Sequence, residues 1–225
     1  MPALSVQRNE VTYTGLYVQP PFALWGEGAK ILEGLYGAFA SSGVTLADIR
    51  SESGGGSVAD EAVRVNFGGQ ASFRFKFDRI EASLGSFTDS DLDGFASLLS
   101  LGDGWLRSAA PDLRFSSHLV SYSAHCALAD TTSTTFLSRI PTPNLAAFGQ
   151  GRGNGVIWHG ESGSTRLQLL LDHSILVQGG LFIQFIMIYL EDRVSFLEML
   201  AVAREKLSSV LEELGLQLSP PPGQI

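Results

Sequence analysis

The sequence predicts an α+β fold. Its first half matches the β-α-β-β-α-β unit of ferredoxin-like folds, and an antiparallel-dominated sheet with further strands and a long C-terminal helix follows. Two segments, "VRVNF" and "ASFRFKF", alternate strictly between apolar and polar residues, as half-buried strands do. Residues 22–42 and 88–110 instead repeat their apolar side chains at helical spacing. Residues 195–215 carry a helix signature, from the capping box Ser195-x-x-Glu198 to Gly215.

The size and composition of the chain favour one folded domain. The chain has 225 residues, of which 44% are hydrophobic and 17% are charged. That length is enough to bury a sizeable core. We therefore expect a single domain over 1–218, which could divide into halves 1–130 and 131–218, followed by a disordered tail over 219–225.

Charge and cysteine content limit the classes of partner. The formal net charge of −8 argues against nucleic acid as a partner, because binding to nucleic acid relies on neutralising phosphates. The single cysteine, Cys126, cannot form an internal disulfide, which favours a cytoplasmic protein. The longest uncharged run, 174–190, is shorter than the roughly 20 residues of a membrane helix. We expect no membrane span.

The first elements are a strand over 9–19, which Pro20-Pro21 ends, and the helix over 22–42. This helix contains several glycines, which weaken a helix by about 1 kcal/mol each relative to alanine. They indicate a close approach to a sheet or to another helix, and they are Gly26, Gly28, Gly34 and Gly37. Gly43 is expected to end the helix.

The sequence favours one of two possible strand registers for the hairpin over 63–77. A two-residue turn at Gly68-Gly69 would place the apolar side of one strand beside the polar side of the other. A three-residue turn that includes Gln70 makes one face fully apolar, so we predict that turn. The opposite face then carries the basic side chains Arg64, Arg74 and Lys76. The alternation breaks at Asp78-Arg79, which we interpret as a bulge.

The second half begins with the helix over 88–110, which Gly102 and Gly104 could interrupt, and continues with a long strand over 114–130. Residues 165–178 and 181–192 then predict a hairpin across Gly179-Gly180. A two-residue turn there would place Ser174 opposite Phe185.

Three segments carry a resemblance to a family: "FKFDRIEASL", the strand "SSHLVSYSAHCAL" after a helix, and the closing "LEELG". With Asp78-Arg79 after a strand and Tyr122 in a later strand, this layout resembles a sporadically distributed family of uncharacterised bacterial proteins of similar length. The sequence lacks the family's usual acidic opening strand and the asparagine expected after the tyrosine. The family has no established activity, so the resemblance implies a fold and no mechanism.

The glycine-rich stretch "FGQGRGNGVIWHGESG", over 148–163, has the composition of a phosphate-binding loop. Such loops work because a helix N-terminus points at the anion, whereas here a strand follows. We interpret the stretch as a connector in which Arg152 could contact an anion. Arg64, Arg74 and Lys76 could do the same, but their aromatic neighbours alternate to the opposite face, which favours a solvated surface.

No catalytic constellation emerges, and no histidine spacing or second cysteine predicts a metal site. Cys126 and His125 are adjacent in a strand and point to opposite faces, so they cannot pair. Cys126 is interpreted as a small buried residue.

One alternative is a small-molecule-binding protein or enzyme with a pocket between the sheet and the C-terminal helix. Its candidate ligand-binding residues are His118, Tyr122, Trp158 and His173. We expect no cofactor.

The segment 181–190 is apolar on both faces of its strand. Either it is a central strand buried on both sides, or one face meets a partner. The leading hypothesis is a non-enzymatic protein-interaction or assembly subunit that acts as a homodimer or in a larger complex. Its expected interface residues are Leu181, Ile183, Phe185, Met187 and Tyr189.

Overall fold

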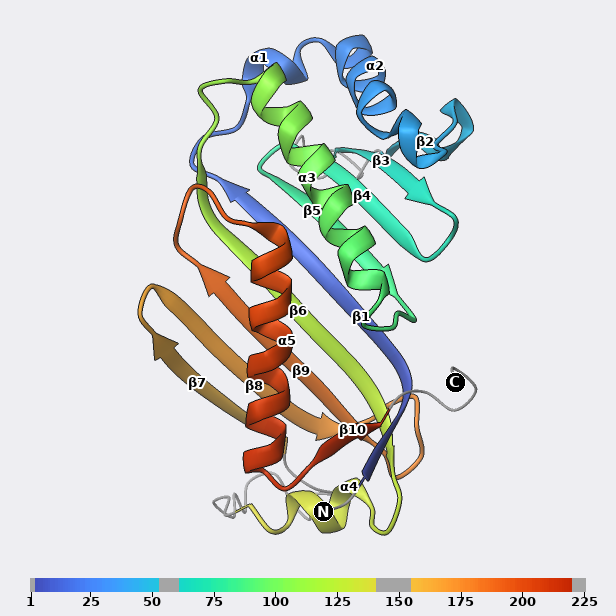
Figure 1. Ribbon diagram of the computed structural model, residues 1–225, viewed down its shortest axis with the longest axis vertical. Helices are drawn as coiled ribbons and strands as arrows, with labels where there is room; N and C mark the ends of the chain where they lie inside the picture. The colour runs from blue at the N-terminus through green and yellow to red at the C-terminus, as the bar shows by residue number, and fades with distance from the viewer. Residues whose placement is uncertain (1–2, 53–60, 141–154, 220–225) are drawn as a thin grey trace, which may run out of the picture. The chain divides into compact units, whose positions relative to one another are not determined.

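The computed structural model describes residues 3–52, 61–140 and 155–219 (Figure 1). The helices are α1 (Phe22–Trp25), α2 (Gly28–Phe39), α3 (Asp91–Ala109), α4 (Ser133–Leu137) and α5 (Phe196–Glu213), with 3₁₀ turns at Ala40–Ser42 and Leu46–Asp48. The first strands are β1 (Ala3–Tyr17), β2 (Ile49–Glu52), β3 (Ala62–Phe67), β4 (Ala71–Lys76) and β5 (Arg79–Gly85). The others are β6 (Phe115–Leu128), β7 (Val156–Ser162), β8 (Thr165–His173), β9 (Leu181–Tyr189) and β10 (Gln217–Ser219).

The described strands form one ten-stranded sheet in the order β2-β3-β4-β5-β1-β6-β9-β8-β7, and β10 pairs in parallel with β1. The predicted ferredoxin-like fold class is therefore wrong, because the molecule is a large antiparallel sheet with few helices. The error began at Asp78-Arg79, which is a chain reversal and not a bulge. Phe75 pairs with Ile80 across that reversal, so β4 and β5 are two antiparallel strands.

The described residues divide into two compact units. Unit 1 is formed by the described residues within 1–10, 121–187 and 202–225, and unit 2 by those within 11–120 and 188–201. The divisions fall inside β1, β6, β9 and α5, and they do not coincide with the expected halves 1–130 and 131–218.

The core of unit 2 lies between the strands β3–β5 and the helices α2 and α3. The three-residue turn is confirmed, since Phe67 pairs with Ala71 and Val65 with Phe73. The rings of β4 on this face contact Phe39 and Trp105, which belong to the two helices. The predicted close approach is confirmed at Gly34, because an added Cβ there would collide with the indole of Trp105. Helix α3 runs unbroken through Gly102 and Gly104.

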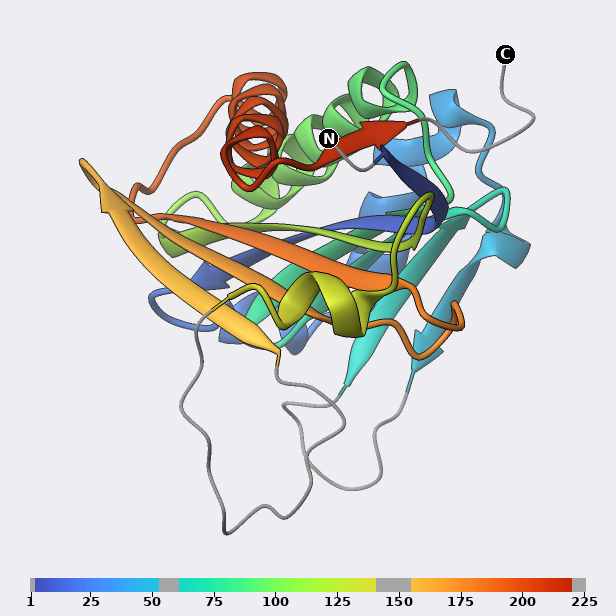
Figure 2. The same cartoon turned by 90° about the horizontal axis from the view of Figure 1, so that it is seen from below.

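In unit 1, the part of α5 from Val202 onward covers one face of β8 and β9 (Figures 1 and 2). On this face the strand residues are buried, and they are Leu169, Leu171, Leu181, Ile183, Phe185 and Met187. The helix contributes the buried side chains Ala203, Leu207 and Leu211. The C-terminal helix itself was therefore predicted at the right place, and it ends before Gly215, whose φ is +72°.

The hairpin between β8 and β9 differs from the predicted two-residue turn. The backbone N–H of Ser174 donates to the carbonyl of Gly180 at 2.9 Å, so Ser174 lies beside Gly180 and not beside Phe185. The Ser174 hydroxyl accepts the backbone N–H groups of Leu176 and Val177 at 3.2 and 2.9 Å. The Ser174 hydroxyl thus holds the start of a loop over 174–180. The glycines lie in its closing turn, where the N–H of Gly180 donates to the carbonyl of Val177 at 2.9 Å and Gly179 has a φ of +68°.

Across residues 3–52, 61–140 and 155–219, no helix has the length and apolar character that crossing a membrane requires.

Candidate interaction surface

The face of β9 that we expected to meet a partner belongs to the core. Leu181, Ile183, Phe185 and Met187 are each at most 2% exposed. Tyr189 is half-buried, and its hydroxyl donates to the carbonyl of Met199 at 3.3 Å. The alternation of the strand was interpreted correctly, but this side of it packs inside the protein. A partner would have to use another surface.

The opposite face of β9 in unit 1 is half-buried. It carries Phe182 and Ile186, with Gln184 between them. The ring of Phe182 lies 4.8 Å from that of His125 on β6. The Gln184 amide donates to the hydroxyl of Ser121, also on β6, at 3.3 Å. This face mixes apolar side chains with locally satisfied polar ones.

Strand β7 is the last strand on its side of the sheet, and within the described residues its only strand neighbour is β8 (Figure 1). Its register places Ile157 beside Leu170 and Trp158 beside Leu169. Ile157 is 53% exposed, whereas Trp158 is half-buried. The strand contains seven residues, of which Glu161 is the only charged one. A strand edge of this length and composition can pair with another strand.

The loop between β8 and β9 displays two aliphatic side chains. Ile175 is 90% exposed and Leu176 is 54% exposed. The backbone that carries them is held by the Ser174 turn and by a hydrogen bond from the N–H of Ser133 to the carbonyl of Gly179 at 2.8 Å. Exposed apolar atoms in unit 1 are thus present on the loop as well as on β7.

Among the predicted ligand residues, His118 lies in unit 2 and is fully buried. Its Nδ1 is 2.7 Å from the hydroxyl of Tyr13, and its Nε2 is 3.3 Å from the carbonyl oxygen of Asp192. Burial lowers the pKa of His118 even though the Asp192 carbonyl raises it, and burial raises the pKa of Tyr13. A neutral imidazole satisfies both contacts if Tyr13 donates to Nδ1 and the Nε2–H donates to the carbonyl.

The hydrogen-bonded chain Tyr13–His118–Asp192 stabilises the fold. The Asp192 carboxylate accepts the backbone N–H of Phe115 at 2.7 Å and is 3.2 Å from Arg114 Nη1. The chain therefore ties β1 and β6 to the segment after β9 with every member paired. Tyr13 and His118 are fully buried, the Asp192 side chain is 29% exposed, and the polar groups of all three already have partners within the protein.

The other predicted ligand residues lie in unit 1. Tyr122 is buried, and Trp158 is half-buried in β7. The ring Nδ1 of His173 is 2.8 Å from the hydroxyl of Ser133 on the short helix α4, a contact that sequence reasoning missed. Ser133 lies forty residues away in the sequence, so no local pattern indicated it. Among the described residues His173 Nε2 has no hydrogen-bond partner, so no third side chain orients the ring as catalysis by a serine requires.

The predicted basic residues do share one face, since Arg64 pairs with Arg74 across β3 and β4. Acidic side chains accompany them. Glu52 lies 3.4 Å from Arg64 and 3.3 Å from Arg74, and Glu81 lies 3.2 Å from Lys76. These basic groups form a compensated network, and a compensated network is a poor anion site. Arg152 lies outside the described residues.

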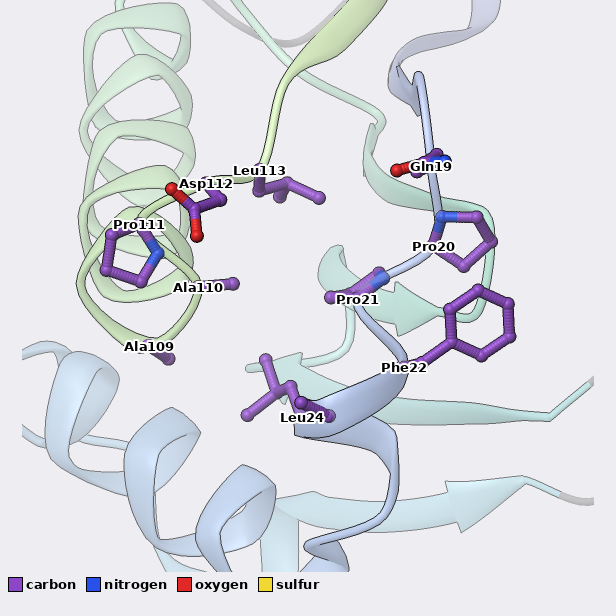
Figure 3. Close-up of a pocket in the computed structure, with 11 residues that line it drawn as sticks. Gln19, Pro20, Pro21, Phe22, Leu24, Ala109, Ala110, Pro111, Asp112 and Leu113 are labelled. Carbon is purple, nitrogen blue, oxygen red and sulfur yellow. The ribbon is translucent and has the colours of Figure 1, made fainter.

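A pocket of about 310 Å³ lies in unit 2, between the β1–α1 segment and the end of α3 (Figure 3). Pro20, Pro21 and Leu24 line one side of it, and Ala110 and Leu113 line the other. It does not contain any of the predicted ligand residues.

Neither a metal site nor a reactive thiol is found in the described part of the chain. No group of three or more His, Cys, Asp or Glu side chains there could hold a metal ion. Cys126 is fully buried, as predicted, and burial raises the pKa of its thiol to about 12. The thiol therefore stays protonated and unreactive near neutral pH.

Comparisons with known proteins do not assign the chain to a family. No family model matches it, and no curated protein matches it. Among solved structures, a rolling circle replication initiator protein from Geobacillus stearothermophilus aligns with 93% of this chain and 84% of its own. The two chains are 10% identical, and the TM-score is 0.32. A similarity of this size carries no argument about fold or function.

Proposed function

We propose that the protein is a non-enzymatic assembly subunit of the cytoplasm that acts as a homodimer or in a larger complex. The observation that carries this proposal is the open edge of β7, where Ile157 is half-exposed and no described strand follows. The aliphatic loop at Ile175 adds exposed apolar surface in the same unit. The one cysteine, buried and protonated, is consistent with a reducing compartment.

The edge of β7 supports a strand-pairing partner for a physical reason. An edge strand presents backbone N–H and C=O groups that need partners, and proteins protect such edges with short strands, charges or proline. The other edge strand, β2, has four residues and includes Arg50 and Glu52. Strand β7 is longer, with seven residues, has no proline and carries one charged residue, Glu161. A second copy of the same strand is the simplest partner, because most soluble oligomers are symmetric.

The test is the oligomeric state by light scattering. The wild-type chain should form a dimer or a larger species, and Ile157→Lys should shift it toward the monomer because the lysine protects the edge. Ser51→Lys, an exposed position on the β2 edge, is the matched control and should leave the state unchanged. A wild-type chain that stays monomeric at every accessible concentration would overturn the proposal.

A second candidate function is small-molecule binding at the pocket of unit 2. It is favoured by the apolar lining and by the carboxylate of Asp112 at its wall, which suit an apolar ligand with a cationic group (Figure 3). A thermal-shift screen should then find a stabilising metabolite of that kind, since binding to the folded state raises stability. Ala110→Trp, which fills the pocket, should abolish the shift. Absence of any shift would remove this candidate.

A further inference from the structure

We propose that two copies pair through β7 in one register, antiparallel and centred on His159. The inference rests on the proposed function above and names the partner and geometry of that same edge. It follows from the residues of β7, from their faces, and from the place of Gly160 beside β8.

Symmetry limits the registers that two identical strands can adopt. In an antiparallel pair, directly opposed residues have side chains on the same face of the sheet. When the two strands are identical and related by a two-fold axis, this requires that one residue lies opposite its own copy, with the axis between the two. If the pair is centred on His159, every residue of β7 has a partner in the other copy: Val156 lies opposite Ser162, and His159 lies opposite its own copy. Centring on Trp158 or Gly160 would pair only 156–160 or 158–162. The His159 register therefore satisfies the most backbone groups.

Gly160 gives this register a side-chain match. On the other side Gly160 pairs with Leu167, and a Cβ added to Gly160 would lie 3.8 Å from the Leu167 side chain. The missing side chain leaves a space beside Leu167 on the face that also carries Trp158. In the His159-centred pair, Trp158 of each copy lies opposite Gly160 of the other. A large aromatic ring opposite an edge glycine covers its bare backbone and stabilises the pair.

Disulfide trapping can identify the register. Directly opposed residues have Cα atoms about 4.5–5.5 Å apart, within the range of a disulfide. His159→Cys should therefore cross-link to its own copy under mild oxidation. Ile157→Cys should not, because its two copies would be about 13 Å apart along the strand, at 3.3 Å a residue. An equimolar mixture of Ile157→Cys and Glu161→Cys chains should cross-link, because those residues oppose each other. Native Cys126 is fully buried and will not interfere.

The outcomes separate this inference from the proposed function. A dimer that cross-links at His159, with no self-cross-link at Ile157, supports the register. A dimer that cross-links at Ile157 alone, or at no β7 position, overturns the register while dimerisation itself stands. A chain that is monomeric by light scattering removes both.

The contact between the tryptophan and the glycine has its own test. Trp158→Ala and Gly160→Val should each raise the dimer dissociation constant about tenfold or more, since buried aromatic anchors dominate interfaces. Gly160 does not have a positive φ, so valine suits its backbone, and circular dichroism should show the fold intact. Unchanged dissociation constants for both variants would overturn the match.

Discussion

The two units differ in how they satisfy their polar and apolar groups. Unit 2 pairs many of its polar groups internally, both in the Tyr13–His118–Asp192 chain and in the ion pairs of Glu52 and Glu81. Its edge strand β2 is short and charged. Both units expose large apolar side chains, such as Ile157 and Ile175 in unit 1 and Phe22 and Leu46 in unit 2, but the edge strand β7 of unit 1 is longer than β2 and carries one charged residue.

The difference between the two edge strands indicates where association is expected. A short, charged edge strand such as β2 resists pairing with another strand. Exposed aliphatic side chains beside an open edge lose contact with water when a partner covers them, and that burial favours binding. Stability is therefore expected to depend most on interior residues of both units, and association on the surface of unit 1.

The largest expected effect on the free energy of unfolding comes from substitutions that compare the two faces of β9. Phe185→Asp places a charge where the side chain is 1% exposed, and it should lower the free energy of unfolding by about 3–5 kcal/mol, or prevent folding. Ile186→Asp, on the half-buried opposite face, should cost roughly 1 kcal/mol or less. Urea denaturation of both variants measures the difference. Equal losses would contradict the assignment of the inward face.

The next effect concerns the interior of unit 2. Tyr13→Phe removes the hydroxyl 2.7 Å from His118 Nδ1 and leaves that nitrogen buried without a partner. Such a loss typically costs about 1–3 kcal/mol. Tyr36→Phe, at an exposed position, is the matched control and should change stability little. A neutral result at Tyr13 would mean that the hydrogen bond does not stabilise the folded state.

The titration of His118 should also affect how the free energy of unfolding depends on pH. The folded pKa of His118 lies below its unfolded value of about 6.5, so the unfolded chain binds more protons as the pH falls. The contribution of His118 to stability should therefore be constant above about pH 6.5 and decline below it. His125, whose pKa burial also lowers, adds to the same decline. Comparing urea midpoints of wild type and His118→Gln from pH 7.5 to 5 isolates the contribution of His118, and parallel curves would argue against it.

The sequence predicted local structure better than it predicted the sheet. The hairpin over 63–77 was predictable because strict alternation and two adjacent glycines permit one register with a fully apolar face. Asp78-Arg79 was misinterpreted because a bulge and a chain reversal both interrupt the alternation, and only the pairing of β4 with β5 distinguishes them.

The surface was only partly predictable for a similar reason. The alternation in β9 showed which side chains share a face, but the inward face depends on α5, which comes later in the chain. The partners of His118 were not predictable, since Tyr13 and Asp192 are brought to it by β1 and by the segment after β9.

The smallest expected effect compares a carboxylate from each unit. Burial raises the pKa of Glu81, but hydrogen bonds from Arg79 and Lys76 outweigh it and leave the pKa below its ordinary value. Glu81→Gln should therefore cost under about 1 kcal/mol at neutral pH, the usual range for partly exposed ion pairs. That stabilisation is present above the unfolded pKa of about 4.3 and is lost as the pH falls through the lower folded value.

Glu161 is the matched control for Glu81. In unit 1 it lies 3.8 Å from Arg166, and both side chains are mostly exposed, at 77% and 63%. Glu161→Gln should leave the urea midpoint unchanged at any salt concentration, whereas the effect of Glu81→Gln should shrink as salt screens the network. If both variants lose the same stability, the internal pairing of charges in unit 2 would not distinguish the two units. A measurable loss at Glu81 alone would show that unit 2 uses its ion pairs for stability and that the exposed Glu161–Arg166 pair of unit 1 contributes little.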